Sequence, residues 1–370
     1  MSNAKLNAEK KGLITFRAGG RCEFEGCNEY LLKDDLTQIE FNNQQYAHII
    51  ADSPKGPRGQ EDSSEHALDV NNIILLCPKH HHLVDTQPEK FSKEMLMEMK
   101  LKHEARVQYL LSLGVDKERT VVLYHANIGS AIINIPHKKA IEALWPDYYP
   151  SPEYIEIGMT NDFLTEGDHS FWDRQKEYLE RLFKLKIVER IDSKNLEKMA
   201  LFAIAPMPLL VLLGTLLSDK YDVLVYNKHR EADTWKWQKG DFPNEFELRK
   251  PENVKGEPCL VFSISASIRY RIERQFPDAS IWEITVPNPK LDYIQTELQM
   301  ESFRNVVREA YADILKVSKS YVNVFMAMPN ACAVEAGRVW MPKADRAMRL
   351  FDYNSSISEL DRYVFTIENL

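Results

Sequence analysis

Residues 200–217 read ALFAIAPMPLLVLLGTLL, eighteen residues without a charge, and their interpretation decides the fold of the larger part of the chain. A charge-free run of this length suits a membrane-spanning helix. Pro206 and Pro208 lie in its middle, however, and proline breaks a helix there but is well tolerated in its first turn. The stretch therefore predicts a buried strand, LFAIA, followed by a helix that begins at the prolines, and no membrane span.

A similar pattern returns near the end of the chain. Residues 321–327 read YVNVFMA and lead to Pro329, and Gly337 stands eight residues beyond that proline, as Gly214 stands eight beyond Pro206. A proline and a glycine at this spacing arise about once by chance in such a chain, so two unrelated strand-to-helix turns remain an alternative. The strand before each pair ends in Ala and a helix follows it, which favours an internal repeat.

A second echo, LVYN at 224–227 and FDYN at 351–354, supports the repeat. From Val121 onward, short β-branched runs alternate with helical stretches, which indicates an α/β fold with a parallel or mixed sheet. Two such halves would face each other across a cleft. Ligands of α/β sheets bind beyond the carboxyl ends of the strands, where helix N-termini attract phosphate. The cleft therefore suits a ligand with two phosphates.

Composition places the chain among ordinary globular proteins. Its 370 residues are 44% hydrophobic and 28% charged, which excludes wholesale disorder, collagen and coiled coil and predicts two or three domains. The net charge of -8 argues against a protein that coats nucleic acid. Five cysteines are no disulfide framework, and the N-terminus lacks the apolar segment of a signal peptide, so we expect a cytoplasmic protein.

The N-terminal region is chemically distinct. Cys22, Cys27, Cys77 and six of the ten histidines lie between residues 22 and 103. The region closes with a predicted helix that Ser92 caps and Gly114 stops. The change of pattern after it predicts two domains, 1–118 and 119–370.

Two pairs of soft ligands stand out in this region. Cys22 and Cys27 are five residues apart, and about fifty residues later Cys77 is followed by His80. Two close pairs brought together give the four ligands of a structural tetrahedral zinc ion. Such a site also suits a zinc-stapled DNA-binding regulator without catalysis, which stays an alternative.

The motifs around these pairs resemble those of the HNH nucleases. They are RCEFEGC at 21–27, AHI at 47–49, NNIILLCPKHH at 71–81 and KHE at 102–104, and the resemblance covers about residues 10–108. It implies a ββα-metal fold of two strands and a helix around one catalytic divalent ion, Mg²⁺ or similar. His48 is then the general base that takes a proton from water, and Asn72 orients His48 by a hydrogen bond.

The resemblance also assigns the three consecutive histidines. His80 binds zinc, His81 binds the catalytic ion, and His82 is exposed, although a slip of one residue would exchange these roles. Asp85 lies one helical turn after His81, on the same face.

A second ligand of the catalytic ion is less clear, because Ala47 stands where the family commonly has an acidic residue before the base. Asp52 and Asp85 are candidates, and ordinary surface carboxylates are the alternative. Lys55, Arg58 and Lys79 flank the motifs and are predicted to contact the phosphates of double-stranded DNA, unless they form only a solvated face. Cutting both strands needs two active sites, so we expect a dimer or a larger homo-oligomer.

Residues 119–370 resemble the SAVED domain, a sensor of two fused CARF-like, Rossmann-like halves that binds cyclic oligonucleotides. The motifs are LFAIAPMPLLVLLG, VLVYNKHREADTWKW, SISASIRYRI and FMAMPNACAVEAGR. With the N-terminal motifs, the whole chain resembles the HNH-SAVED effector nucleases of CBASS antiphage systems. The resemblance implies a DNA endonuclease that is silent until a cyclic dinucleotide, of the 3′,2′-cyclic GMP-AMP type, activates it during infection.

The ligand would be held by residues near the predicted cleft. Trp235 and Trp237 alternate on an extended segment, and either ring is a candidate to stack on a purine, with core packing as the alternative. The other predicted ligand-binding residues are the cations Lys228 and Arg230, the serines Ser265 and Ser267, and the helix-opening Pro206, Met207, Pro329 and Asn330. A clustered basic face on residues 120–370 would instead favour a restriction nuclease that recognises modified DNA.

Overall fold

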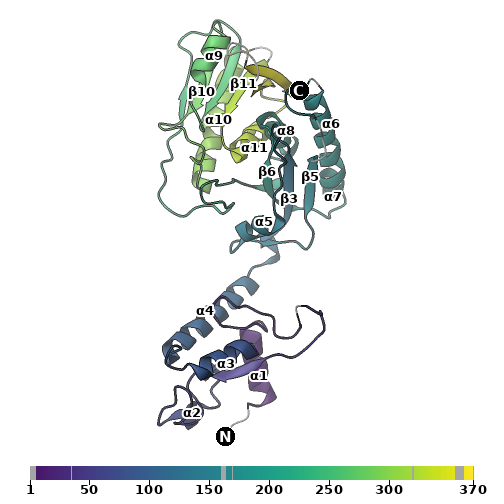
Figure 1. The fold of residues 1–370 in the computed structure, drawn as a ribbon. Coiled ribbons are helices and arrows are strands. Elements are labelled where there is room, and N and C mark those ends of the chain that lie inside the picture. Colours follow the sequence, from purple (N-terminus) through teal and green to yellow (C-terminus); the bar gives the residue numbers. More distant parts are fainter. Residues whose placement is uncertain are drawn as a thin grey trace. The chain divides into compact units, whose positions relative to one another are not determined.

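A computed structural model gives the fold and describes residues 6–34, 36–159, 164–168, 170–318, 321–354 and 362–369 (Figure 1). The chain divides into two compact units, Met1–Asp116 and Lys117–Leu370. This division falls two residues before the boundary predicted at 118. Each unit has hydrophobic clusters of its own.

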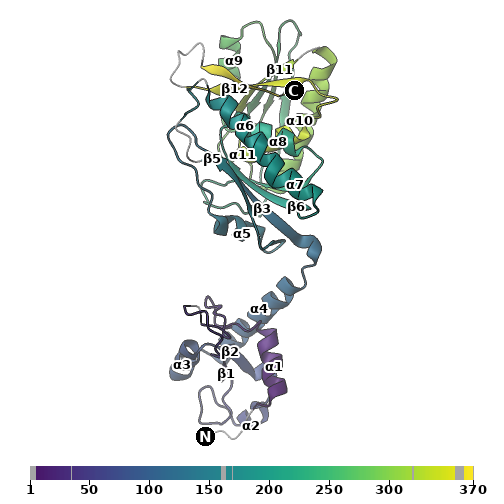
Figure 2. The ribbon, with the colours of Figure 1, turned by 90° about the vertical axis from the view of Figure 1, so that its right-hand side faces the viewer.

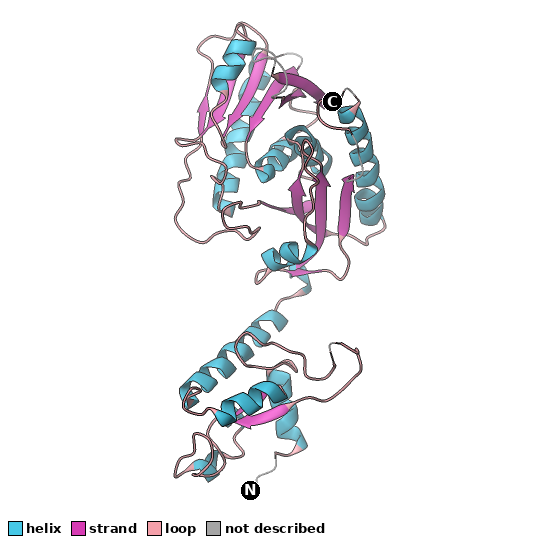
Figure 3. Cartoon of the chain, in the orientation of Figure 1, coloured by secondary structure: helices cyan, strands magenta, loops and turns pink. Residues whose placement is uncertain are grey.

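The N-terminal unit is built around a short antiparallel ribbon of β1 (Gln45–His48) and β2 (Ile73–Leu76), in which His48 stands opposite Ile73. All four residues of β2 are buried, and its apolar run IILL forms the centre of the core. The helices are α1 (Ala8–Arg17), the single turn α2 (Ser63–His66), α3 (Pro78–Thr86) and α4 (Lys93–Leu111) (Figures 2 and 3). Ser92 caps α4 by accepting from Met95 N–H, as the sequence predicted.

The second unit contains two sheets. One has the order β4-β3-β6-β7 with β5 beside β3, and its neighbouring strands are parallel throughout. Its strands and helices are β3 (Glu118–Ala126), α5 (His137–Leu144), β4 (Tyr149–Pro150), β5 (Ile155–Met159), α6 (Phe171–Phe183), α7 (Glu189–Asp192), β6 (Lys198–Ile204), α8 (Met207–Leu217) and β7 (Asp222–Tyr226).

The other sheet has the order β13-β12-β11-β9-β10-β8 and is mixed, because β8 and β13 run antiparallel to their neighbours. Its elements are β8 (Glu247–Arg249), β9 (Pro258–Ser263), α9 (Arg269–Gln275), β10 (Ser280–Thr285), α10 (Glu297–Val317), β11 (Tyr321–Ala327), α11 (Asn330–Val339), β12 (Ala347–Tyr353) and β13 (Tyr363–Asn369). The prediction of an α/β fold with parallel or mixed sheets is thereby confirmed.

The two halves repeat one β-α-β unit, and its two helices pack against each other. Strand β6 leads through α8 to the parallel β7, as β11 leads through α11 to the parallel β12. In Figure 1, α8 and α11 lie between the sheets, and their residues share one core with both. Gly214 and Gly337 meet where the helices cross, and a Cβ on Gly214 would lie 2.0 Å from the Val334 carbonyl oxygen. The predicted repeat is therefore present, and its two glycines let α8 and α11 approach each other closely.

The apolar run at 200–217 forms β6 and α8, as its two prolines predicted. Pro206 is the N-cap residue of α8, and Pro208 lies in its first turn. Of the helices that the structure describes, none combines the length and the apolar character needed to span a membrane.

Candidate metal centre and ligand pocket

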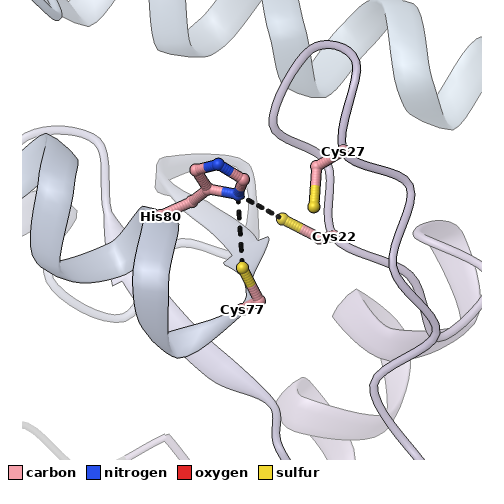
Figure 4. A group of neighbouring side chains, drawn as sticks. All are labelled: Cys22, Cys27, Cys77 and His80. Atoms are coloured by element: carbon pink, nitrogen blue, oxygen red, sulfur yellow. Dashed lines mark hydrogen bonds between the residues drawn. The ribbon is translucent and has the colours of Figure 1, made fainter. Parts of the chain in front are cut away.

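The N-terminal unit brings together the four predicted zinc ligands (Figure 4). Cys22 and Cys27 come from the loop after α1, Cys77 is the N-cap of α3, and His80 lies in its first turn. His80 Nδ1 is 3.2 Å from Cys77 Sγ and 3.7 Å from Cys22 Sγ. Tetrahedral zinc with bonds of about 2.0–2.3 Å separates its ligand atoms by roughly 3.3–3.8 Å. The geometry therefore fits a metal ion of this kind.

Burial makes this cluster unfavourable for free thiolates. Loss of water raises the pKa of the Cys22 thiol, and the neighbouring Cys77 and Cys27 raise it further. Burial also raises the pKa of Cys77. A bound dication reverses this effect, since a coordinating thiol is deprotonated outright. The donor set of three sulfurs and one imidazole nitrogen is one that selects zinc.

The predicted general base, His48, ends β1, and its ring is held by the backbone. Its Nε2 lies 3.0 Å from the Ala67 carbonyl oxygen. Because a carbonyl only accepts, Nε2 carries the proton and Nδ1 is the nitrogen with a lone pair. The Ala67 carbonyl group therefore fixes which nitrogen of this imidazole carries the lone pair.

Asn72 does not bond to the ring of His48, which corrects the prediction. Its side chain accepts from Ile50 N–H at 2.8 Å and donates to the carbonyl oxygens of Ile50 and His66. Asn72 is buried, and these three bonds satisfy its amide. It ties the segment after β1 to the segment before Ala67, so its effect on His48 passes through the backbone.

Arg58 is not an exposed DNA contact, which is a second correction. Its side chain is 5% exposed. The guanidinium donates to the carbonyl oxygens of His48, Ile49 and Val84 and to Asp85. These bonds connect the end of β1 to α3, so Arg58 is a positioning residue. Its position in a Pro- and Gly-rich loop gave no sign of this role.

His81 and Asp85 lie one turn apart on α3, as predicted, with His81 Nε2 3.2 Å from Asp85 Oδ2. Asp85 also accepts a hydrogen bond from Arg58, so its carboxylate contacts both side chains. Among the described residues, the four predicted zinc ligands are the one group of three or more potential metal ligands within 4.8 Å of one another. Asp52 is thus not grouped with His81 and Asp85. His82, Lys55 and Lys79 are exposed.

In the second unit, the two predicted stacking tryptophans differ sharply. Trp235 is 2% exposed and packs edge-on against Phe202, with Lys228 Nζ over its ring. This burial contradicts a stacking role for Trp235, and core packing explains the residue. Trp237 is half-buried and lies near Tyr226 and His229. Trp237 also lines a pocket.

That pocket, of about 860 Å³, lies between β7, α10 and the end of α11. Trp237 and Tyr148 supply aromatic rings, and Arg304, Asn305 and Arg308 supply donors from one face of α10. Its volume lies in the range of pockets that hold small-molecule ligands. None of the described residues predicted from the helix-opening loops or the serines is part of its lining.

The pocket carries both signs of charge. Arg338 is saturated, since it donates to the carbonyl oxygens of Ser218, Tyr221 and Val223 and to Glu335. Arg304 lies 3.7 Å from Glu335, and its side chain is 40% exposed. Arg304 and Arg308 were not among the predicted ligand residues, although their spacing of four residues places them on one face of a helix.

The remaining predicted ligand residues are spread over the carboxyl edges of the sheets. Lys228 is half-buried and forms an ion pair with Asp233, whereas Arg230 and Ser267 are exposed. Asn330 donates to the Ala203 carbonyl oxygen, which ties α11 to β6. Pro206 and Pro329 are buried, Met207 and Ser265 half-buried. The structure does not gather these residues into the pocket that Trp237 lines.

Comparison with solved structures finds distant matches. The Acinetobacter baumannii Cap4 SAVED/CARF-domain containing receptor with the cyclic trinucleotide 2'3'3'-cAAA is 15% identical, with a TM-score of 0.41, over 84% of this chain and 66% of that chain. The Moraxella osloensis Cap4 receptor is 15% identical, with a TM-score of 0.39, over 83% and 65%. The chain thus spans slightly less than two thirds of these receptors. A search of curated proteins found no match.

A protein-family model covers most of the second unit. The model of the SMODS-associated and fused to various effectors sensor domain, SAVED, matches residues 179–368. The matched segment contains both β-α-β units and the pocket-lining α10, and it leaves the N-terminal unit outside. The chain therefore belongs to the SAVED sensor-domain family.

Proposed function

We propose that the protein is a DNA endonuclease that a cyclic oligonucleotide activates, and that it acts as an antiphage effector. The observation that carries this proposal is the fusion of a SAVED sensor domain to a separate unit with a two-stranded ribbon, a following helix and a Cys₃His cluster. A sensor needs an output, and this unit holds the residue types of phosphodiester hydrolysis.

Within the N-terminal unit, His48 is proposed to take the proton of the attacking water on Nδ1, the nitrogen left basic by the Ala67 contact. His81, helped by Asp85, is the proposed protein ligand of a catalytic Mg²⁺ or similar ion, which would stabilise charge on the phosphate. Arg58 keeps these groups in register by bonding the backbone of both elements. The zinc cluster holds the loop after α1 against α3.

The proposed ligand site is the pocket lined by Trp237, Arg304 and Arg308. An aromatic face beside guanidinium groups suits a nucleotide, because a base stacks on the ring and a phosphate pairs with arginine. A cyclic dinucleotide of the 3′,2′-cyclic GMP-AMP type remains our first expectation. Cyclic trinucleotides belong in the same test, since the Acinetobacter Cap4 receptor was solved with one.

The proposal is tested by incubating the purified chain with supercoiled plasmid and Mg²⁺, with and without a panel of cyclic di- and trinucleotides. We expect cleavage only when Mg²⁺ and one panel member are both present. Plasmid that stays intact under every condition, although the protein binds it, would favour the zinc-stapled regulator. Cleavage that depends on DNA modification and ignores the panel would favour the restriction nuclease.

The chemistry is tested by His48→Ala, with His82→Ala as its control on the exposed side of the same unit. His48→Ala should abolish cleavage and leave zinc content and ligand affinity near those of the wild type, because the base is separate from both sites. His82→Ala should retain cleavage. Full activity of His48→Ala would overturn the assignment of the base.

A further inference from the structure

The pocket lined by Trp237 contains acceptors that no protein donor uses. Its arginines are engaged by acidic residues, since Arg304 lies 3.7 Å from Glu335 and Arg308 pairs with Asp345 at 2.9 Å. The lining also holds three carboxylates to which the described part of the chain gives neither a hydrogen bond nor an ion pair: Asp219, Glu297 and Glu301. The pocket therefore offers unused acceptors as well as the donors of its arginines.

Of these three carboxylates, Glu297 lies near the aromatic rings of the pocket. It is the first residue of α10, which begins with a capping box of Thr296 and Gln299. Burial, and next the Glu297 carboxylate, raise the pKa of the Tyr226 hydroxyl, so Glu297 is close to this ring. The Tyr226 ring lies 6.4 Å from that of Trp237, with an angle of 24° between the two planes. Glu297 is therefore near the ring on which a base is proposed to stack.

The surroundings of Glu297 favour a ligand that brings donors. Loss of water, and next the carboxylate of Asp147, raise the pKa of Glu297, and Arg304 opposes them. Asp147 and Glu297 carry like charges, and each disfavours ionisation of the other. Hydrogen bonds donated by a ligand would stabilise the charged form of Glu297. The same carboxylate would repel an acceptor placed against it.

Guanine is the base whose donors match a carboxylate. Its Watson–Crick edge presents N1–H and the N2 amino group side by side, so the two oxygens of Glu297 can accept both in a bidentate pair. Adenine presents a donor at N6 but an acceptor at N1, which would face the carboxylate with its lone pair. A site built to accept two hydrogen bonds rejects a ligand that lacks one, because a polar group is then left unpaired.

The position of Glu297 on α10 also agrees with the length of a nucleotide. Arg304 follows Glu297 by seven residues, which places it two turns along the same face and about 10 Å along the helix axis. This separation is similar to that between the Watson–Crick edge of a nucleotide and its phosphate. One nucleotide can thus reach Glu297 with its base and Arg304 with its phosphate.

We propose that Glu297 is a specificity-determining residue, which selects a guanine base by accepting from its N1–H and its N2 amino group while Trp237 stacks on the ring. The inference rests on the proposed function, because it takes the pocket lined by Trp237 as the site of the cyclic oligonucleotide. It goes beyond that function by assigning the base and the side chain that reads it. The activating ligand then carries at least one guanine.

The test uses the full chain with Glu297→Gln. Its matched control is Glu309→Gln, because Glu309 is an exposed residue of the same helix that pairs with Lys250 and does not line the pocket. Calorimetric titration compares probes that differ in one base: 3′,2′-cyclic GMP-AMP with its inosine-for-guanosine analogue and with cyclic di-AMP of the same linkage. A second pair, cyclic AMP-AMP-GMP and cyclic triadenylate, covers the trinucleotides.

We expect the wild type to bind the guanine probe at least about tenfold more tightly than the adenine probe of the same ring size. The inosine analogue, which lacks the N2 amino group, should fall between them. Glu297→Gln should lose most of this preference, since an amide has one acceptor and suits adenine instead. Glu309→Gln should keep it. Glu297→Asp, which retains a carboxylate, should keep more of the preference than Glu297→Gln.

The failures of the two proposals give different results. If the wild type binds the probes without a preference for guanine, or if Glu297→Gln keeps the preference, the selection is wrong and the proposed function survives. Equal loss of affinity for the guanine and adenine probes in Glu297→Gln also overturns the selection. That result would place Glu297 on a group that both probes share, such as the ribose.

A direct probe covers the case in which the wild type binds no cyclic oligonucleotide, which would overturn the proposed function. Saturation-transfer NMR then compares 5′-GMP and 5′-AMP with the wild type and with Glu297→Gln. Transfer to the H8 proton of GMP that exceeds transfer to AMP, and that Glu297→Gln loses, upholds guanine selection in this pocket. Equal transfer to both nucleotides, equal transfer in both proteins, or none overturns it. Thermal unfolding of each variant checks that α10 stays folded.

Discussion

Arg58 shows how one side chain connects the elements that carry the proposed chemistry. Four hydrogen bonds run from its guanidinium to the end of β1 and to α3, and its backbone is in the left-handed region at a φ of +57°. Nothing in the sequence PKGPRGQ distinguishes Arg58 from the exposed Lys55. Burial of a lone arginine depends on which carbonyl groups the fold leaves without partners, and a local pattern does not contain that information.

Arg58→Met should destabilise the N-terminal unit by about 2–3 kcal/mol, because buried carbonyl oxygens lose their donor. The left-handed backbone is equally unfavourable for both residues, so strain does not contribute. Lys55→Met, at an exposed position, should change stability by less than about 0.5 kcal/mol. Denaturant unfolding of the full chain measures both. Equal stability of Arg58→Met and the wild type would show that the bonds in the structure contribute nothing.

His229 gives the second unit a dependence on pH. Its side chain is 1% exposed, neither ring nitrogen has a hydrogen-bond partner in the described part of the chain, and burial lowers its pKa, opposed by Asp292. The unfolded chain then binds the proton more tightly, so stability is full above the unfolded value of about 6.5 and declines as the pH falls below it.

His229→Gln should flatten this decline between pH 6.5 and 5, whereas His137→Gln, at a half-buried position in the same unit, should leave it unchanged. Thermal unfolding at a series of pH values measures the slope. An unchanged slope in His229→Gln would mean that other groups cause the acid sensitivity.

At the scale of elements, α8 and α11 depend on close approach at Gly214 and Gly337. A Cβ on Gly214 would lie 2.0 Å from the Val334 carbonyl oxygen, and one on Gly337 would lie 2.1 Å from that of Val211. The sequence predicted the repeat from the spacing of proline and glycine. It did not reveal the purpose of the glycines, since the two helices are more than a hundred residues apart and their contact is tertiary.

Gly214→Ala should therefore destabilise the second unit by roughly 1–3 kcal/mol or more, through overpacking of backbone against backbone. Gly12→Ala, in α1, is the matched control, because its Cβ would meet nothing within 4 Å. That substitution should stabilise the N-terminal unit by about 0.5–1 kcal/mol, as alanine normally does in a helix. The two changes thus have opposite predicted signs. A stabilising Gly214→Ala would refute the close crossing.

The Cys₃His cluster brings a loop and a helix together, and its four residues were predicted from their spacing in the sequence. Cys77→Ser should lower the bound zinc and destabilise the N-terminal unit, since metal binding and folding are coupled. Cys259→Ala is the control: it removes a buried thiol from the other unit and should leave the zinc content unchanged. Elemental analysis and denaturant unfolding measure the two effects. A Cys77→Ser protein with full zinc content would show that the cluster does not hold the metal.

For the molecule as a whole, the clustering of cysteine and histidine and the change to alternating β-branched and helical runs were enough to predict two units and the α/β architecture of the second. Both signals are local, and both survive into the fold as the Cys₃His cluster and the β-α-β units. The ligand pocket was not predictable in the same way. Its walls come from β7, α10 and α11, which are distant from one another in the sequence. Such sites exist only after the sheet has assembled.

The proposed activation requires that the ligand prefer one state of the molecule, because a ligand shifts an equilibrium only through its differential affinity. We expect the cyclic oligonucleotide to favour a homo-oligomer in which N-terminal units act in pairs on the two DNA strands. Trp237→Ala should raise the ligand concentration for half-maximal cleavage by roughly 5- to 150-fold, the equivalent of about 1–3 kcal/mol of base stacking, without changing the rate at saturation. Tyr154→Ala, an exposed ring that stacks on His137, should have no effect.

Trp235→Ala tests the distinction between the two tryptophans. Removal of its buried ring should cost about 3–5 kcal/mol of stability, and a thermal scan should show this loss before any effect on ligand response.

Light scattering and plasmid nicking, titrated together with ligand, then examine the switch itself. Cleavage that begins with no change in particle mass would mean that assembly is not the switch. If Trp237→Ala leaves the ligand titration unshifted, the ligand binds outside the pocket between β7 and α10. Stacking on the Trp237 ring is the contact that distinguishes this pocket from a site that binds the ligand by charge alone.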